Sequence, residues 1–348
     1  VTSGGFSVRY YSDCFMFNVA GISCFPNEHL EYLLGLLNTK ITSNITQILN
    51  PTINMNAGDV AKVPVVISHE DEPYVKSLVT SMIQSAKIDW NSFETSWDFK
   101  YQPLLRYFFS IHSAVPTGTE RPIYEIIKDI GSNHHIEVSK GYPTHAKLQT
   151  SYETWQNACN QRFQQLKANE EELNRIFIDI YGLQDELTPE VADKDVTVHY
   201  LADTKEDIPA SLQGSNYVLT RRDVMVSLIS YAVGCMFGRY SLDVEGLAYA
   251  GGDWNAVYRM QQEIYTVEGK EVHLADGRVL TVKPTGYNQI KTDDGWKNLS
   301  YPVDTDNVIP ICDDEYFDDD MVGRFVKFIE TVYGSDTLEE NLKFIADA

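Results

Sequence analysis

Asp253, Glu268 and Lys270 combine two carboxylates with a lysine. Metal-dependent nucleases use these residue types to hold a divalent cation and to activate water. Glu268 and Gly269, however, fall at a predicted hairpin turn, where side chains are usually solvated. We therefore favour a structural role for these residues and keep a nuclease as the weakest of three functional hypotheses.

Histidines and acidic residues at two other places could bind a metal ion. His134, His135 and His145 lie near one another in the sequence, but no cysteine or carboxylate cluster at ligand spacing accompanies them. The acidic run at 313–320 lacks the glycine and the closing glutamate of a calcium-binding loop. We expect exposed loop histidines and either a solvated helix start or a partner-binding patch, and we predict no metal site.

The segment NPTI at 50–53 partly matches the Asn-Pro-Pro-aromatic motif with which amino-methyltransferases hold their target base. The second proline and the aromatic residue are missing, and no glycine-rich turn after a strand precedes the segment. We therefore interpret Asn50-Pro51 as the end of a helix. The chain also has no Walker loop, dinucleotide fingerprint or serine nucleophile elbow, so we predict no catalytic residue and no cofactor-binding residue in it.

Length and composition indicate a folded protein of ordinary composition. The 348 residues are enough for two or three compact units. Apolar residues make up 43% of the chain and charged residues 22%, close to the globular average. The chain has no run of about 18 apolar residues, so we expect no membrane-spanning helix. It starts at Val1 without a signal segment, and we expect it to be part of a longer protein.

The cysteines predict a reducing compartment. They are odd in number, scattered, and form no CxxC pair, which is typical of reduced thiols in a cytoplasmic protein. The five cysteines are Cys14, Cys24, Cys159, Cys235 and Cys312.

Negative charge is concentrated in the second half of the chain. The net charge is −22, of which residues 1–65 carry −1 and residues 66–150 carry −2. Residues 151–250 carry −8 and residues 251–348 carry −11. The acidic half should repel a phosphate backbone, so any contact with nucleic acid is expected in the first 150 residues.

Hydrophobic periodicity predicts an α+β fold that is mostly helical. Alternating apolar residues predict strands within 6–25 and at 60–67, on either side of a helix that Asn27 caps and that stops near Asn50. This small strand–helix–strand segment, with a polar turn at 54–59 before its last strand, forms the first predicted region, 1–67.

Long helices follow in the second predicted region, 68–190, a helical spacer or scaffold. Ser68 and Asp71 are suited to cap a helix at 68–87. A helix at 151–181 should end at Gly182, and Thr188-Pro189 should start another.

The third predicted region, 191–348, is acidic and mainly helical. It should contain an irregular stretch at 192–220, a buried helix at 224–237 and a helix at 321–333. A last helix should be capped by Thr337 and Glu340. Alternating residues at 262–284 predict a three-stranded antiparallel meander, within a possible β insertion at 255–300.

Several segments resemble known families. LLGLLNTK at 33–40 and GDVAKVPV at 58–65 resemble the end of target-recognition domains of restriction–modification specificity modules. ETSWDF at 94–99, LKANEEELN at 166–174 and SYAVGCMFGRY at 230–240 are similar to the C-terminal half of PglX-type adenine-specific DNA methyltransferases of BREX phage-defence systems.

The resemblance implies the DNA target-recognition and scaffold portion of a site-specific N6-adenine methyltransferase. The family's methyltransferase domain lies N-terminal to these segments and is absent here, so the chain is not expected to methylate DNA alone. S-adenosylmethionine is the expected cofactor of that missing domain. The implied partners are double-stranded DNA, the methyltransferase domain of the same protein, and other defence-system subunits.

Reading a base sequence requires amide or basic side chains in the major groove. Tyrosines nearby could stack on bases or contact phosphates. The candidate DNA-binding residues are Arg9, Tyr10, Tyr11, Lys40, Asn54 and Asn56.

Two alternatives stay open. Arg9 and Lys40 could be solvated surface charges without a ligand. The whole chain could instead be an acidic protein-interaction module, because residues 151–348 carry a net charge of −19. Such a module would assemble defence-complex subunits or mimic DNA.

Overall fold

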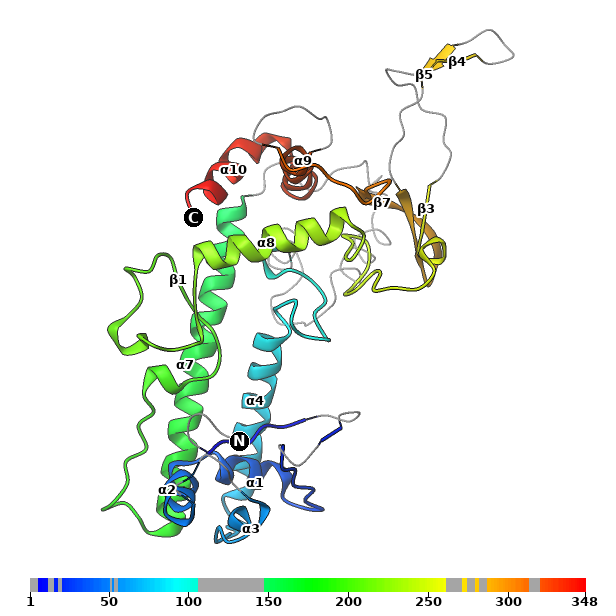
Figure 1. Ribbon diagram of the computed structural model, residues 1–348. Helices are drawn as coiled ribbons and strands as arrows, with labels where there is room; N and C mark the ends of the chain where they lie inside the picture. Colours follow the sequence, from blue (N-terminus) through cyan, green and yellow to red (C-terminus); the bar gives the residue numbers. More distant parts are fainter. Residues whose placement is uncertain are drawn as a thin grey trace. The chain divides into compact units, whose positions relative to one another are not determined.

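The computed structural model describes residues 6–11, 16–17, 21–50, 52, 56–105, 147–260, 271–273, 279–281, 287–312 and 320–348. The chain divides into two compact units. Figure 1 shows its helices and strands. Unit 1 comprises Val1–Trp90, Ala158–Leu201 and Glu206–Val218, and unit 2 comprises Asn91–Asn157, Ala202–Lys205 and Leu219–Ala348. The division into two compact units does not test the three functional regions predicted from the sequence, so those regions stay a prediction.

The elements confirm an α+β fold that is mostly helical. The α-helices are α1 (Leu30–Leu37), α2 (Lys40–Leu49), α3 (Ala57–Val60), α4 (Glu72–Trp90), α7 (Leu148–Tyr181), α8 (Arg221–Met236), α9 (Met321–Tyr333) and α10 (Leu338–Ala346). Short 3₁₀ helices are η1 (Asp193–Asp195), η2 (Ala210–Leu212), η3 (Trp254–Ala256) and η4 (Ser335–Thr337). The strands are β1 (Tyr200–Ala202), β2 (Val218–Thr220), β3 (Tyr258–Arg259), β4 (Glu271–His273), β5 (Val279–Thr281), β6 (Tyr287–Thr292) and β7 (Gly295–Val303).

The predicted helix that ends near Asn50 is two helices. The chain leaves α1 at Asn38, and Thr39 has an extended backbone and caps α2 by accepting a hydrogen bond from the Thr42 amide at 3.5 Å. Threonine is a preferred N-cap, which explains the break inside a continuous apolar pattern. The predicted cap at Asn27 is wrong, because His29, with a left-handed backbone at φ 59°, occupies the N-cap of α1.

The described residues of 6–25 and 60–67 are not in strands, contrary to the prediction. Residues 57–60 form α3, and two tyrosine hydroxyls bind the backbone that follows. Tyr181 donates to the Pro64 carbonyl at 2.6 Å and accepts from the Val66 amide at 3.1 Å. Tyr32 donates to the Val66 carbonyl at 2.9 Å and accepts from the Ser68 amide at 3.2 Å. Side chains thus satisfy backbone groups that a sheet would have paired.

The core of unit 1 lies where α1 and α4 pack with the C-terminal part of α7. Gly35 permits a close approach of α1 and α4, since a Cβ atom there would stand 3.0 Å from a methyl group of Val79. Tyr32 contacts the Phe177 ring edge-on, with ring centres 5.0 Å apart. The buried residues of this cluster are Tyr32, Leu36, Ile41, Val75, Val79, Leu173, Ile176, Phe177 and Ile178.

A buried carboxylate joins the end of α4 to α7 and to the segment before β1. The Asp89 side chain is only 6% exposed and lies 3.6 Å from the Arg162 guanidinium. It also contacts His199 twice, through the backbone amide at 3.1 Å and the ring Nδ1 at 2.8 Å. Burial of this charge is tolerated because these partners compensate it.

Three short-range predictions have clear outcomes. Helix α9 begins and ends as predicted, and α7 is followed by Gly182 at φ 66°. No helix starts at Thr188-Pro189, because side chains of α7 bind this backbone: Asn174 donates to the Pro189 carbonyl at 3.1 Å, and Glu171 accepts from the Val191 amide at 3.0 Å.

The capping pair predicted for the last helix does not form. The Thr337 hydroxyl donates to the Tyr333 carbonyl at 3.2 Å, and Glu340 pairs with Lys147 at 2.8 Å. Helix α10 nevertheless begins at the next residue, Leu338.

Unit 2 contains a three-stranded antiparallel sheet in the order β3-β6-β7. Strands β4 and β5 pair antiparallel, as two strands of the predicted meander should, and the third predicted strand lies outside the described residues. Tyr258, Ile290 and Val303 form a buried cluster against Trp254. Gly238, at φ 72°, follows the end of α8 and lies against this cluster. A Cβ atom there would stand 2.7 Å from Trp254.

Among the described residues, no helix combines the length and the apolar character needed to cross a membrane.

Replacing Asp89 with alanine should lower the free energy of unfolding by about 3–5 kcal/mol, because Arg162 and the His199 amide lose their buried partner. Urea unfolding followed by circular dichroism measures this change. Asp179 is the matched control: its side chain is 50% exposed and pairs with Arg175 at 3.5 Å. Asp179→Ala should cost less than about 1 kcal/mol. Equal effects of the two substitutions would contradict a structural role for the Asp89 charge.

Candidate nucleic-acid interface

The predicted N-terminal contact residues lie in a segment without regular secondary structure, held at two points. The Val8 amide donates to Asn38 Oδ1 at 2.9 Å, which ties residues 6–11 to the end of α1. The Lys87 ammonium of α4 lies 5.3 Å from the centre of the Tyr10 ring. Tyr10 and Tyr11 are 39% and 69% exposed, and Arg9 is also exposed. The segment and Lys87 of α4 therefore present two aromatic rings and two cations to solvent or to a ligand.

Lys40 and Asn56 lie elsewhere in unit 1. Lys40 is the half-buried first residue of α2, and its backbone amide donates to Asn174 Oδ1 at 3.0 Å. Asn56 is exposed before α3, and its amide donates to Asp59 Oδ2 at 3.4 Å. Asn54 lies outside the described residues. These contacts place the candidates at three different points of unit 1, and their role in DNA binding stays a prediction.

Arg9 acts electrostatically on α7. Burial raises the pKa of Glu170 to about 7, and the Arg9 charge works against this rise. Arg9 thus lies close enough to Glu170 in unit 1 for its charge to favour the ionised carboxylate. A phosphate that engaged Arg9 would weaken this effect and favour protonation of Glu170.

The other groups considered for catalysis or metal binding are only partly within the described residues. Asp253 accepts from the Asn255 amide at 3.0 Å and caps η3, which is a local structural role. The remaining members lie outside the described residues: Glu268, Lys270, His134, His135, His145 and positions 313–319 of the acidic run. In the part of the chain that is described, no three His, Cys, Asp or Glu side chains are grouped to hold a metal.

The described cysteines, Cys24, Cys159, Cys235 and Cys312, are free thiols. Burial raises the pKa of Cys159 to about 12, and it also raises the pKa of Cys235. These two thiols therefore stay protonated at neutral pH and are not nucleophiles. Cys14 lies outside the described residues.

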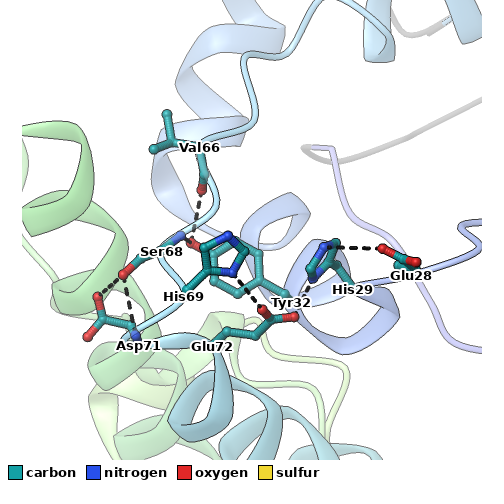
Figure 2. Close-up of polar contacts among 8 residues, drawn as sticks. All are labelled: Glu28, His29, Tyr32, Val66, Ser68, His69, Asp71 and Glu72. Carbon is teal, nitrogen blue, oxygen red and sulfur yellow. Dashed lines mark hydrogen bonds and ion pairs between the residues drawn. The ribbon is translucent and has the colours of Figure 1, made fainter.

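The structure brings together a histidine–glutamate cluster that the sequence patterns did not indicate (Figure 2). Glu72, the first residue of α4, accepts a hydrogen bond from His29 Nδ1 at the start of α1. Its other carboxylate oxygen lies 3.7 Å from His69 Nδ1, and Glu28 lies 3.9 Å from His29 Nε2. His29 and Glu72 are 43 residues apart in the chain, so only the packing of α1 on α4 unites them.

The same view shows how the start of α4 is fixed (Figure 2). The Ser68 hydroxyl accepts from the Asp71 amide at 3.3 Å and donates to the Asp71 carboxylate at 2.6 Å, so the two residues interact as predicted. The helix itself begins at Glu72 and not at Ser68, and the Ser68 amide donates to Tyr32 instead of completing a capping box. Tyr32 holds the adjoining backbone at Val66 and Ser68. The carboxylate of Glu72 is thereby positioned between two imidazoles.

This arrangement lowers the pKa of Glu72. The hydrogen bond from His29, and secondarily the charges of His29 and His69, hold the pKa of Glu72 below its usual value of 4.5. A carboxylate with a lowered pKa in the folded state stabilises the fold above its unfolded value, and this contribution is lost as the pH falls. The cluster therefore links the α1–α4 contact to pH.

We expect Glu72→Gln to lower the melting temperature at pH 6, with a difference from the wild type that shrinks as the pH falls below 4.5. Thermal melts between pH 3 and pH 7, which bracket the usual pKa of 4.5, test this. Glu70→Gln, at an exposed neighbouring position, is the control and should leave the melting curve unchanged. A Glu72→Gln effect that grew toward low pH would contradict the interpretation.

Comparison with known proteins places the chain beside large adenine-specific methyltransferases, and the similarity runs along its whole length. It is 36% identical over 352 aligned residues to "Adenine-specific methyltransferase PglX" of Lacticaseibacillus casei (strain Zhang). It is 28% identical over 354 aligned residues to "Adenine-specific methyltransferase BrxX" of Escherichia coli O9:H4 (strain HS). The resemblance expected from the sequence is confirmed.

The chain spans only 22% and 23% of the length of these two relatives, although all of it is aligned. No family model matches the chain.

Proposed function

We propose that this chain is the DNA target-recognition and scaffold portion of a site-specific N6-adenine DNA methyltransferase in a phage-defence or restriction–modification system. The observation that carries the proposal is the similarity, along the whole chain, to two proteins named as adenine-specific methyltransferases. The chain spans about a fifth of each relative, and because its sequence contains no recognised methyltransferase motif, we assign the methylation itself to other residues of such a protein.

The geometry of unit 1 supports a recognition role. An enzyme that modifies one adenine must extrude it from the duplex while holding the neighbouring base pairs. The exposed segment at Arg9, Tyr10 and Tyr11, with Lys87 beside it, offers phosphate and stacking contacts for such a duplex. The part of helix α7 in unit 1, from Ala158 to Tyr181, is about 36 Å long and would serve as scaffolding within that unit.

S-adenosylmethionine would bind outside this chain in our proposal. Nucleotide-like cofactors are usually held at a glycine-rich turn between a strand and a helix. Here β2 runs directly into α8: Thr220 ends the strand and caps the helix with Asp223, without a glycine or a loop. This junction does not fit the cofactor, so no chemical step is assigned to residues of this chain.

The partners that we propose are double-stranded DNA and the methyltransferase domain of the same protein, with other defence subunits as further candidates. An acidic interaction module is the alternative, and one observation favours it: the net charge of −19 on residues 151–348. Such a surface would attract a basic protein and repel DNA.

The first test measures, by fluorescence anisotropy, how tightly the 348-residue chain binds random-sequence DNA duplexes. We expect Arg9→Ala and Lys40→Ala each to weaken binding by roughly 5-fold to 100-fold, the range for one lost phosphate or base contact. Lys62→Ala is the matched control, since Lys62 is 61% exposed and pairs with Asp59. If Lys62→Ala weakens binding as much as the other two, the candidate residues make no specific contact.

A segment exchange tests target recognition directly. The aligned segment of the Lacticaseibacillus casei relative would be replaced by this chain, and adenine methylation in cells would be mapped by long-read sequencing. We expect the methylated sequence motif to change with the exchanged segment. An unchanged motif at an unchanged level would place recognition elsewhere and favour the acidic interaction module.

A further inference from the structure

The outer face of the β3-β6-β7 sheet carries an ordered set of polar and cationic side chains. The strand register places Gln289 opposite both Arg259 and Asn298, and Lys291 opposite Trp296. Residues directly opposite one another project from the same face of a sheet, and alternate residues of a strand share that face. These five residues, which we call the Arg–Gln–Asn face, therefore lie on the side away from the buried cluster at Tyr258 and Ile290.

Side-chain contacts hold this face in a defined arrangement. Arg259 Nε donates to Gln289 Oε1 at 2.6 Å, and Gln289 Nε2 donates to Asn298 Oδ1 at 2.7 Å. The Arg259 guanidinium lies 4.3 Å from the centre of the Trp296 ring, and the Lys291 ammonium lies 5.7 Å from it. Gln289 is only 7% exposed, whereas Arg259, Lys291 and Asn298 are exposed. The face thus exposes two cations, Arg259 and Lys291, and the amide of Asn298, and the contacts among its side chains fix their arrangement.

The local charge differs from that of the rest of the acidic half. Residues 258–303 carry six basic and six acidic side chains, so their net charge is zero. Residues 304–348 carry three basic and thirteen acidic side chains. The sheet-bearing segment therefore lacks the excess of negative charge that would repel a phosphate backbone.

We propose that the Arg–Gln–Asn face binds double-stranded DNA. Arg259 and Lys291 would neutralise phosphates, and Asn298 would contact the edges of bases or the backbone beside them. An antiparallel ribbon fits the major groove, where arginine and amide side chains have partners on base edges. The inference rests on the proposed DNA partner of the chain, but it concerns unit 2 and residues distinct from the candidates of unit 1.

An acidic protein is the other occupant that this face could attract. The amide groups and the antiparallel ribbon favour the duplex, since both match groove recognition. The face is consequently assigned to DNA, and the experiment below separates the two occupants.

The test measures binding of the full 348-residue chain to random-sequence duplexes between 50 and 200 mM salt. The double variant Arg259→Gln with Lys291→Ala should weaken binding at least 10-fold and lower the slope of log K against log salt by about 2. The matched control is Lys327→Ala with Lys343→Ala, which also removes two exposed cations from unit 2. The control should bind like the wild type.

Because Arg259 also supports Gln289, the single variant Lys291→Ala accompanies the double variant, with circular dichroism to confirm folding. Lys291→Ala alone should lower the salt slope by about 1. Wild-type affinity and slope in both folded variants would overturn the inference and favour an acidic protein as the occupant. If Arg9→Ala still weakened binding in that case, the proposed function would stand without this face. If the wild-type chain bound no duplex, both proposals would fail.

Discussion

Unit 1 depends on one buried charge. The carboxylate of Asp89 is taken out of water at the end of α4, and its partners come from α7 and from the backbone before β1. Removal of a carboxylate from water costs several kcal/mol unless charged and hydrogen-bonding partners replace the solvent. Arg162 and His199 are those partners, so three segments that are distant in the sequence must meet at one point. Phe163 and Leu166 of α7 also form a buried cluster with Val196 and Val198 in the same unit.

Tyrosine hydroxyls play a comparable part at the other end of α4. Tyr32 and Tyr181 each donate to one backbone carbonyl and accept from one amide between residues 64 and 68. The chain therefore crosses the surface of unit 1 without a partner strand. This path places His69 and Glu72 next to His29, and the start of α4 becomes sensitive to protonation.

The two surfaces proposed to contact DNA share a physical design. In each, a cation lies over an aromatic ring: Lys87 over Tyr10 in unit 1, and Arg259 over Trp296 in unit 2. Such stacking restricts a long basic side chain before any ligand arrives, which reduces the entropy lost on binding. Both surfaces also lie in nearly neutral segments of a chain whose net charge is −22. A polyanion could approach these segments although the chain as a whole repels it.

The sequence by itself determined helices such as α7 and α9, the acidic character of the second half and the resemblance to PglX-type methyltransferases. Helices α7 and α9 were predictable because apolar periodicity and caps such as Gly182 are local properties of the chain. The absence of the strand expected at 60–67 was not predictable, because it depended on the hydroxyl of Tyr181, more than a hundred residues away. The break between α1 and α2 was not predicted, because the apolar stripe continues across Thr39, the residue that caps α2. Tertiary structure alone decided the Glu72 cluster and the Arg–Gln–Asn face, since both arise from contacts between segments whose distance and register no local pattern encodes.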